Sequence, residues 1–419
     1  MMRITLITIG SRGDVEPFVA LGKGLSEAGF RVCLASHERF RAFVTAYGLE
    51  FRPVAGDPRE ILQKAEGQTL LAGGRSFLRF LWNLRQIARP YAGAVLADSL
   101  AACADADLII YGVLAFTGYH LGEYLGVPAL PALLQPAGRT RAFPVISLPA
   151  GTNLGGPLNY LSHALAEQFF WQAGRPVINP WREQLGLRRL PLIGPYRRYY
   201  QAQRPFLYGF SPLVVPKPAD WYEAMSVTGY WFLPPLPDWQ PPARLTDFLA
   251  AGPPPIYFGF GSMTDREPAE LMQLTREALT RTGQRGVVLT GWGGLDETAN
   301  ADDLLVIDEV PHRWLFPRMK MVIHHGGAGT TAAGLRAGVP TIVIPYFADQ
   351  PFWGERLETL GVAPAPIPRR ALTAEKLAAA IQQVLADEPM QARAASLGRQ
   401  IAAEDGVGNA VRFLQQTFA

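Results

Sequence analysis

A glycine-rich segment, His324-His-Gly-Gly-Ala-Gly-Thr-Thr331, contains the residues of this sequence that are best suited to bind an anion. It directly follows a predicted strand at 321–323 and leads into an alanine-rich helix predicted at 332–337. Because the main-chain N–H groups at a helix start have no partner within the helix, they point at one spot together with the positive end of the helix dipole. Such a spot favours a doubly charged phosphate.

Glycines in this segment let a phosphate approach the main chain, and the two threonines can add hydroxyl donors. A histidine, His325, can donate a further hydrogen bond to a phosphate oxygen. The alternative is a glycine-rich turn that only packs closely, with both histidines buried in the core. Since a histidine, three glycines and two threonines converge here, we expect phosphate binding. The expected contacts come from His325, Gly327, Gly329 and Thr330.

Other nucleotide-binding and metal-binding patterns fit the sequence less well. It lacks the GxxxxGK[ST] loop that holds a nucleoside triphosphate. The first glycine turn, Gly10–Asp14, lacks the spacing of a dinucleotide fingerprint, but Glu38 lies where a ribose-binding acid would, so a nicotinamide enzyme remains a weaker alternative. Asp105-Ala-Asp107 resembles a DxD metal motif, yet it lies away from the glycine-rich segment, and we expect solvated helix-end charge. No metal site is predicted.

The elements that must position these residues form two similar halves. The pattern predicts a buried strand at 3–9, a helix at 17–28 that Gly29 closes, and a second strand at 30–35. The same order begins again with a strand at 256–261, followed by a glycine turn and a helix. Alternating strands and helices of this kind predict an α/β protein with two doubly wound parallel sheets.

A passage rich in proline and aromatic residues separates the two halves. Seven prolines lie between Leu213 and Pro242, a density that resists regular structure and stiffens the chain. The first half also carries a long apolar stretch at about 62–200, which would suit an apolar ligand. We therefore expect four parts, which are a first domain at 1–215, a linker at 216–242, a second domain at 243–398 and a C-terminal helical segment at 399–419.

The composition excludes several classes of protein. The 419 residues are 48% hydrophobic and 18% charged, as in an ordinary globular protein. A net charge of +3 gives no support to a nucleic-acid partner. Cys33 and Cys103 lie far apart, without zinc-site spacing, and fit a reducing compartment. No stretch reaches the roughly 18 apolar residues that cross a bilayer, so we expect a soluble cytoplasmic protein.

Three segments together resemble a known signature. Val310–Phe316, His324–Thr331 and Pro345–Gly354 are similar to the donor-binding region of family 1 glycosyltransferases, and most similar to the sterol glucosyltransferase branch and its bacterial relatives. The Gly10–Pro17 turn and Thr228–Phe232 also resemble that branch. The resemblance implies the GT-B fold, in which two Rossmann-like domains face each other across a cleft. It further implies a UDP-sugar donor, usually UDP-glucose, and an inverting reaction. Helix-start amides with His325, Ser262 and Thr330 can stabilise the leaving charge, so we expect no requirement for a metal.

The resemblance also assigns roles to individual residues. It implies that His325 and Ser262 contact the diphosphate, that Asp349 and Gln350 hold the sugar hydroxyls, and that main chain near Val310 contacts the uracil. In plant members a tryptophan stacks on the base, and Glu309 occupies that place here, while His312 replaces the following glutamine. Either Trp292 or Trp314 could therefore supply the ring that stacks on the base. By the same analogy, the segment 399–419 crosses back onto the first domain.

Asp14 is the expected catalytic base. It follows the glycine turn at the carboxyl end of the first strand, where ligands bind in open α/β sheets. The resemblance places the catalytic acidic residue at this position, or a histidine in the plant members. A carboxylate with a pKa near ~4 is a weak base, so it would take the proton late, as the new bond forms. The alternative is that Asp14 only caps the helix expected to start near Glu16.

The acceptor would be an apolar alcohol such as a sterol, terpenoid, polyketide or flavonoid. Aromatic residues of the first half can line its pocket, or they can be ordinary core. The pocket candidates are Phe77, Phe80, Trp82, Phe116 and Phe143. A basic patch at Arg188-Arg189 and Arg197-Arg198 can contact an anionic membrane peripherally, or it can be solvated surface.

Three functions remain open from the sequence. The first is a UDP-dependent hexosyltransferase that needs only a nucleotide-sugar donor and an apolar acceptor, with no protein partner implied. The second is a GT-B epimerase or hydrolase of nucleotide sugars, which the long apolar stretch disfavours. The third is a non-catalytic nucleotide-sugar-binding protein, which the presence of Asp14, His325 and Asp349-Gln350 disfavours.

Overall fold

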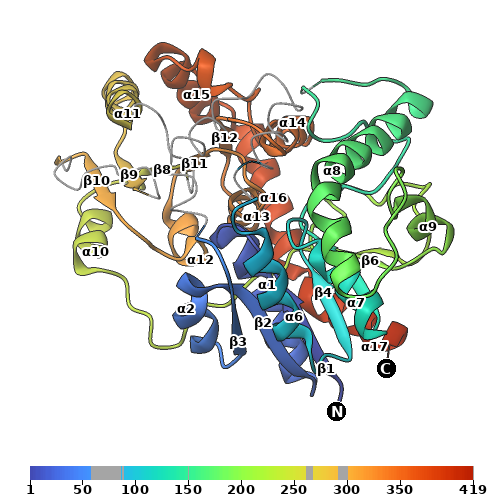
Figure 1. Cartoon of the computed structure of the whole chain (residues 1–419). Helices are drawn as coiled ribbons and strands as arrows, with labels where there is room; N and C mark the ends of the chain where they lie inside the picture. Colours follow the sequence, from blue (N-terminus) through green and yellow to red (C-terminus); the bar gives the residue numbers. More distant parts are fainter. Residues whose placement is uncertain (58–85, 87–88, 150, 261–267, 291–300, 419) are drawn as a thin grey trace. The chain divides into compact units, whose positions relative to one another are not determined.

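The computed structural model describes residues 1–57, 86, 89–149, 151–260, 268–290 and 301–418. The chain divides into two compact units, each with its own parallel sheet (Figure 1). The first unit comprises Met1–Leu148, Thr152–Leu233 and Asp405–Ala419, and the second comprises Pro149–Gly151 and Pro234–Glu404.

The first unit is built on a seven-stranded sheet in the order β3-β2-β1-β4-β5-β6-β7, and all neighbouring strands are parallel. Strand β1 is buried along its whole length, as expected for a parallel strand covered on both faces. The strands are β1 (Arg3–Ile7), β2 (Arg31–His37), β3 (Glu50–Val54), β4 (Leu108–Tyr111), β5 (Ala129–Leu133), β6 (Phe206–Tyr208) and β7 (Met225–Val227).

Helices cover this sheet on both faces. Because side chains alternate along a strand, Ile4 and Leu6 enter one core with α1 and α17, while Ile7 enters a second core with α6 and α7. The C-terminal helix α17, red in Figure 1, packs against α1. The helices are α1 (Arg12–Glu27), α2 (Arg41–Ala46), α6 (Ala92–Cys103), α7 (Thr117–Leu125), α8 (Gly156–Gln184), α9 (Tyr196–Gln201) and α17 (Gly406–Phe418).

The second unit has a five-stranded parallel sheet in the order β10-β9-β8-β11-β12. Its strands are β8 (Ile256–Gly259), β9 (Gly286–Leu289), β10 (Leu304–Ile307), β11 (Met321–His324) and β12 (Thr341–Val343). Its helices are α10 (Ala243–Ala250), α11 (Pro268–Thr282), α12 (His312–Leu315), α13 (Ala328–Ala337), α14 (Gln350–Thr359), α15 (Ala374–Ala386) and α16 (Glu388–Ala403).

Two helices begin earlier than their sequence patterns predicted. Helix α1 begins at Arg12 instead of Pro17. Pro17 has no N–H to donate to the Gly13 carbonyl, but Gly13 is exposed, so water can bond this carbonyl and the helix tolerates the proline. Helix α13 begins at Ala328 instead of Ala332. Strand β7 lies within the stretch expected as linker, where Met225–Val227 pairs with β6.

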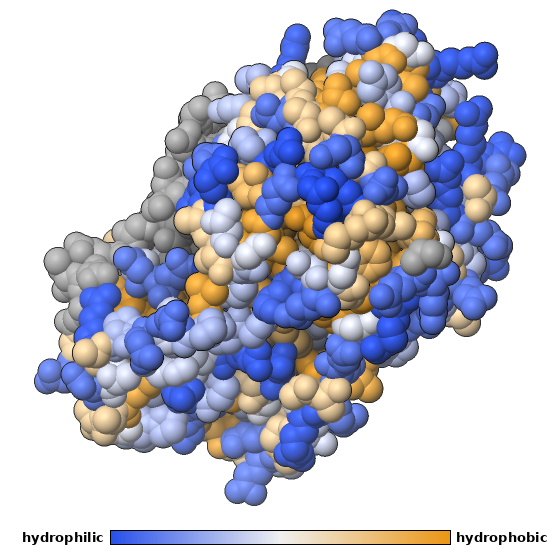
Figure 2. All heavy atoms as spheres, turned by 90° about the horizontal axis from the view of Figure 1, so that it is seen from below, coloured by the Kyte–Doolittle hydropathy of each residue, from blue (hydrophilic) through white to orange (hydrophobic). Residues whose placement is uncertain are grey.

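The surface is mixed in character. On the face shown in Figure 2, hydrophilic residues cover much of the area, with smaller hydrophobic areas between them. No helix in the described part of the chain combines the length and the apolar character needed to span a bilayer.

Candidate functional site

The glycine-rich segment connects strand β11 to helix α13 in the second unit. Gly326 has a φ of 89°, and a Cβ there would lie 2.9 Å from the Gln350 carbonyl oxygen, so this turn requires glycine. Gly327 is extended, and its carbonyl accepts the first helical hydrogen bond from Thr331 N–H at 2.9 Å. The N–H groups of residues 328–330 therefore point out of the helix start, as an anion site needs. We call residues 324–331 the phosphate cradle.

Two neutral histidines support the cradle. His324 Nδ1 accepts the main-chain N–H of Gly326 at 2.9 Å, so the proton of this ring lies on Nε2. Burial lowers the pKa of His324 well below its ordinary value and lowers the pKa of His325 to about 4. Both rings are therefore neutral near pH 7, and each keeps one N–H donor.

Three polar atoms of the cradle are buried and have no hydrogen-bond partner among the residues that the structure describes. They are His324 Nε2, His325 Nδ1 and Thr331 Oγ1. Leaving such a group unpaired costs about 1–3 kcal/mol, so buried polar atoms normally have partners. The His325 ring also lies directly against Gly327, where a Cβ would be 2.4 Å from Nε2. These atoms belong to the residues around the helix start, where the sequence predicts a phosphate.

The loop that follows strand β12 lies against the cradle. The Cβ position of Gly326 is 3.3 Å from Gln350 Cβ, and Gln350 Oε1 accepts the N–H of Tyr346 at 2.8 Å. Asp349 Oδ2 accepts Trp353 Nε1–H at 2.9 Å. Burial raises the pKa of Asp349, against the opposite effect of this hydrogen bond. The structure thus brings Asp349 and Gln350 beside the expected diphosphate site.

Of the residues expected near the base, Val310 lies between β10 and α12, and Trp314 lies within α12. The Val310 side chain is buried in the core of the second unit. The Trp314 ring is half-buried, with Trp239 at a centroid distance of 5.6 Å and the Arg318 guanidinium 4.2 Å from the ring centroid. Trp239 and Arg318 therefore hold Trp314 in place, and a nucleobase could stack only on the part of the ring that these two side chains leave uncovered.

Asp14 lies in the first turn of α1, after the carboxyl end of β1. Its Oδ2 accepts hydrogen bonds from Ser11 N–H at 2.8 Å and from Ser11 Oγ at 3.0 Å. The φ of Gly10 is 139°, and a Cβ there would lie 2.3 Å from the same oxygen. The carboxylate therefore caps the helix and has a fixed orientation. Since a carboxylate accepts several hydrogen bonds, capping leaves room for a second role.

An apolar loop lies beside the Asp14 turn. Gly112 N–H donates to the Ile7 carbonyl at 2.9 Å, and the Cβ position of Gly112 is 3.5 Å from Thr8 Oγ1. Thr8 Oγ1 in turn donates to the Asp14 carbonyl at 2.9 Å. The next residues expose apolar side chains, which are Val113 (43%), Leu114 (39%) and Phe116 (46%). Phe116 thus reaches the same sheet edge as Asp14, together with two residues that the sequence did not single out.

Phe143 is held in a different place, against helix α8. Its carbonyl oxygen lies 3.0 Å from His163 Nε2, and the two rings are 6.0 Å apart between centroids. Burial lowers the pKa of His163, so this contact is that of a neutral ring. Five other predicted site residues lie outside the described residues. They are Phe77, Phe80, Trp82, Ser262 and Trp292.

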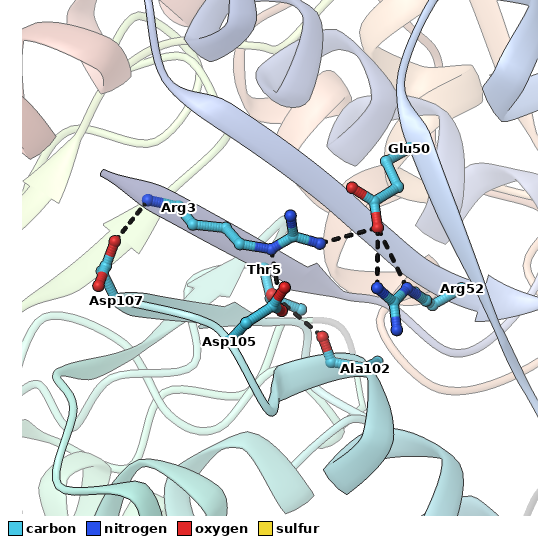
Figure 3. A network of polar contacts seen from close by, with 7 residues as sticks. All are labelled: Arg3, Thr5, Glu50, Arg52, Ala102, Asp105 and Asp107. Atoms are coloured by element: carbon cyan, nitrogen blue, oxygen red, sulfur yellow. Dashed lines mark hydrogen bonds and ion pairs between the residues drawn. The ribbon is translucent and has the colours of Figure 1, made fainter. Parts of the chain in front are cut away.

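The DxD-like pair binds an arginine at the other edge of the first sheet (Figure 3). Asp107 Oδ2 accepts Arg3 N–H at 2.7 Å, Asp105 pairs with Arg3 Nε at 2.9 Å, and Glu50 accepts from Arg3 Nη2 at 2.8 Å. Both aspartates are exposed just after the end of α6, as expected for solvated helix-end charge. They also hold Arg3, since Asp105 and Glu50 pair with its buried guanidinium and Asp107 with its main-chain N–H. In the described ranges, no group of His, Cys, Asp or Glu side chains is arranged to hold a metal.

Glu38, the acid that kept a nicotinamide enzyme as an alternative, lies in a short 3-10 turn after β2 (Glu38–Phe40). Its Oε1 and Oε2 accept hydrogen bonds from Arg41 Nε at 2.6 Å and Nη2 at 2.9 Å. These bonds lower the pKa of Glu38. The carboxylate is thus engaged by a neighbouring guanidinium, which weakens its case as a ribose ligand.

Three supporting residues escaped the sequence analysis. Ser11 orients Asp14, Trp353 orients Asp349, and His324 fixes the turn at Gly326. The first two relations were readable in principle, since residues three or four apart face each other in a helical turn. The pair of histidines is visible in the sequence, but which of the two rings points inward depends on the register of β11.

Comparison with known families identifies the two units. Residues 4–144 match the family described as the glycosyltransferase family 28 N-terminal domain. Residues 289–414 match the erythromycin biosynthesis protein CIII-like C-terminal domain. The two matches cover β1 with the Asp14 turn and the whole phosphate cradle.

Solved structures identify the fold. The chain is similar to the glycosyltransferase of kitacinnamycin, with a TM-score of 0.71 and 20% identity over 100% of this chain and 99% of that one. It is also similar to the calicheamicin glycosyltransferase CalG4, with a TM-score of 0.69 and 19% identity over 100% of both chains. These neighbours and the two parallel sheets identify the GT-B fold.

Curated relatives narrow the assignment. The chain is 38% identical to a sterol 3-beta-glucosyltransferase of Cryptococcus neoformans, covering 98% of this chain and 27% of that protein. It is also 38% identical to a sterol 3-beta-glucosyltransferase of Arabidopsis thaliana, covering 98% of this chain and 65% of that protein. The chain thus spans about a quarter of the fungal relative and two thirds of the plant one. It belongs to the family 1 glycosyltransferases.

Proposed function

We propose that the chain transfers glucose from UDP-glucose to the hydroxyl group of an apolar small molecule, with a sterol as the first acceptor to test. The observation that carries the proposal is the phosphate cradle, where three buried polar atoms lack partners in the described part of the chain beside an open helix start. The similarity to sterol 3-beta-glucosyltransferases supports glucose and sterol as the first choices.

The cradle would stabilise the departing UDP. As the bond between the sugar and the diphosphate breaks, negative charge grows on the phosphate oxygens. The N–H groups of residues 328–330, the His325 ring and the Thr330 hydroxyl are preorganised donors for that charge. Main-chain donors of this kind need no cation beside them, so we propose a reaction that does not require a metal.

Neighbouring elements would hold the rest of the donor. Asp349 and Gln350 lie beside the cradle and can accept and donate hydrogen bonds to sugar hydroxyls, with Trp353 orienting the Asp349 carboxylate. Main chain at Val310 and the half-buried Trp314 ring are the candidates for the base. A structural neighbour was solved with thymidine diphosphate, so TDP-glucose is the donor to compare with UDP-glucose.

The acceptor would bind beside Asp14. Val113, Leu114 and Phe116 expose apolar surface at that sheet edge, which suits an alcohol with a large apolar body. Asp14 would take the hydroxyl proton as the acceptor oxygen attacks the anomeric carbon. The bond between the anomeric carbon and the phosphate oxygen would break, and its electron pair would leave with UDP. A single displacement of this kind inverts the configuration at the anomeric carbon.

A reducing compartment such as the cytoplasm would suit this chain. Cys33 and Cys103 are both buried free thiols, and burial raises the pKa of Cys33 to about 11 and of Cys103 to about 12. Such thiols remain protonated and unreactive at neutral pH. They behave as small apolar core residues.

UDP release from UDP-glucose, measured with and without a panel of apolar alcohols, tests the proposal. Acceptor-dependent turnover that Asp14→Ala abolishes and EDTA leaves unchanged is the expected result. Turnover without any acceptor would indicate an epimerase or hydrolase instead, and donor binding without turnover would indicate a binding protein. Loss of activity in EDTA would refute the metal-free mechanism.

A further inference from the structure

Helix α8 exposes leucines along one face. Leu158, Leu161 and Leu165 follow each other at spacings of three and four residues, so they lie on the same side of the helix. Their exposed fractions are 54%, 48% and 48%. Glu167 is the sole charged residue in the sequence from 156 to 174, and it turns away to pair with the part-buried Arg139. About three helical turns therefore present an uncharged apolar surface.

The apolar surface continues onto the loop before α9. Leu192 and Ile193 are 61% and 51% exposed. Their carbonyl oxygens accept the side-chain amides of Gln172 at 2.6 Å and Gln168 at 2.7 Å, and these glutamines extend the spacing that begins at Leu165. The loop is thus fastened along the same face of the helix. We call Leu158, Leu161, Leu165, Leu192 and Ile193 the α8 surface.

Exposed arginines lie near the α8 surface. Residues 139–204 contain nine arginines and two glutamates, whereas the whole chain has a net charge of only +3, so the positive charge is concentrated here. Both glutamates are already paired, Glu167 with Arg139 and Glu183 with Arg189. Exposed arginines lie at each end of the surface, since the Arg141 carbonyl accepts Asn159 Nδ2–H in the first turn of α8 at 3.1 Å, and Arg197 and Arg198 begin α9.

We propose that the α8 surface docks on a lipid bilayer that carries anionic headgroups. The leucines and Ile193 would enter the interfacial region, and the arginines would contact the lipid phosphates. A second copy of the chain is a poorer occupant, because a symmetric contact would bring arginines against arginines. An apolar acceptor molecule would explain the leucines but would leave the arginines without a counterpart.

Docking would place the first unit at a reservoir of membrane-dissolved alcohols. That consequence rests on the proposed function, whereas docking itself is a property of the surface alone. Flotation with vesicles can therefore be measured without donor or acceptor. A protein that floats but shows no turnover would refute the proposed function and leave docking intact, and the reverse result would do the opposite.

The test compares phosphatidylcholine vesicles with and without phosphatidylglycerol. We expect the wild-type chain to float with the anionic vesicles and to be released by salt. Leu161→Asp with Leu165→Asp should lower the partition coefficient at least about tenfold, since apolar burial is lost and negative charge is added. Leu213→Asp is the matched control, because Leu213 is 38% exposed in the same unit but lies outside the α8 surface, and it should float like the wild type.

A second pair of variants, on α9, tests the electrostatic contribution to membrane binding without changing helix α8. Arg197→Gln with Arg198→Gln should weaken binding to anionic vesicles about fivefold per arginine and should leave the thermal unfolding of the chain unchanged. Arg31→Gln, an exposed arginine at the start of β2, is its control.

Three results would overturn docking. The first is a wild-type chain that ignores both kinds of vesicle. The second is a dimer in solution that the leucine variants dissociate, which would assign the surface to a second copy. The third is vesicle binding that survives the leucine variants while turnover of a detergent-dispersed acceptor is lost, which would assign it to acceptor binding.

Discussion

Replacing Gly327 by alanine should weaken donor binding without unfolding the second unit. The new Cβ would lie 2.4 Å from His325 Nε2, 3.2 Å from Cε1 and 3.3 Å from Cδ2. Since relaxed contacts lie near 3.5 Å, the ring must retreat by about 1 Å. Gly327 itself has φ −63° and ψ 144°, which alanine adopts without strain.

The effect on binding follows from that displacement. A hydrogen bond lengthened by about 1 Å is lost, and one to a charged group contributes about 1.5–3 kcal/mol. The affinity for UDP should therefore fall about 10- to 150-fold. Isothermal titration calorimetry measures this fall, and urea unfolding should show a loss of stability of no more than about 1 kcal/mol, because alanine is a poorer helix cap than glycine.

A control and a double variant make this prediction refutable. Gly334→Ala adds a methyl group to the same helix, where the nearest contact is Thr341 Oγ1 at 3.2 Å, and it should leave UDP affinity unchanged. In a His325→Ala background, Gly327→Ala should have little further effect, since both changes remove one contact. Equal losses from Gly334→Ala, or full additivity with His325→Ala, would contradict the placement of His325 against the diphosphate.

Three further changes test the rest of the site. Asp14→Asn keeps an acceptor oxygen for Ser11 but cannot take a proton, so acceptor-dependent kcat should fall about 100- to 10,000-fold while UDP affinity, measured by calorimetry, stays constant. Trp353→Phe removes the N–H that Asp349 accepts, which should raise KM for UDP-glucose about tenfold with unchanged UDP affinity and cost about 1–3 kcal/mol of stability in urea; an unchanged KM would remove Asp349 from the sugar site. The pKa of His325 is about 4 in the folded chain and about 6.5 in the unfolded one, so the unfolded state binds the proton first and stability should fall as pH drops from 6.5 to 4, by up to about 3 kcal/mol from this ring. His325→Gln should lose that share of the slope in urea unfolding measured across this pH range, and an unaltered slope would contradict it.

Much of the fold could be predicted because its signals are local. The central strands β1, β4, β8 and β11 are short, mostly apolar runs with a glycine at or soon after their carboxyl ends, and such runs are typical of buried parallel strands. Strands β6 and β7 could not be recognised, since three residues show no usable period and β7 lies in a proline-rich stretch. The place of β6 is set by pairing with β5, far away in the sequence, and that of β7 by pairing with β6.

The candidate site also has a part that local sequence predicts and a part that it does not. The cradle could be predicted because one continuous segment supplies the turn, the donors and the helix start. The apolar loop at Val113–Phe116 could not, because its closeness to Asp14 depends on the parallel pairing of β1 with β4 across about a hundred residues. The partners of Asp105 and Asp107 were missed for the same reason, since Arg3 lies on the neighbouring strand.

The two kinds of site also differ in how much substitution they can bear. The cradle is made of main chain packed so closely that a methyl group on Gly326 or Gly327 meets a carbonyl oxygen or a histidine ring. In the loop at Val113–Phe116, three of the four side chains are exposed and can change without moving the strand that carries them, while Ala115 is buried. If the proposed function holds, specificity for the anionic donor would be built into the backbone of one unit, whereas the choice of apolar partner would rest on replaceable side chains of the other. Relatives on this fold can accordingly share the donor chemistry while they differ in what they modify.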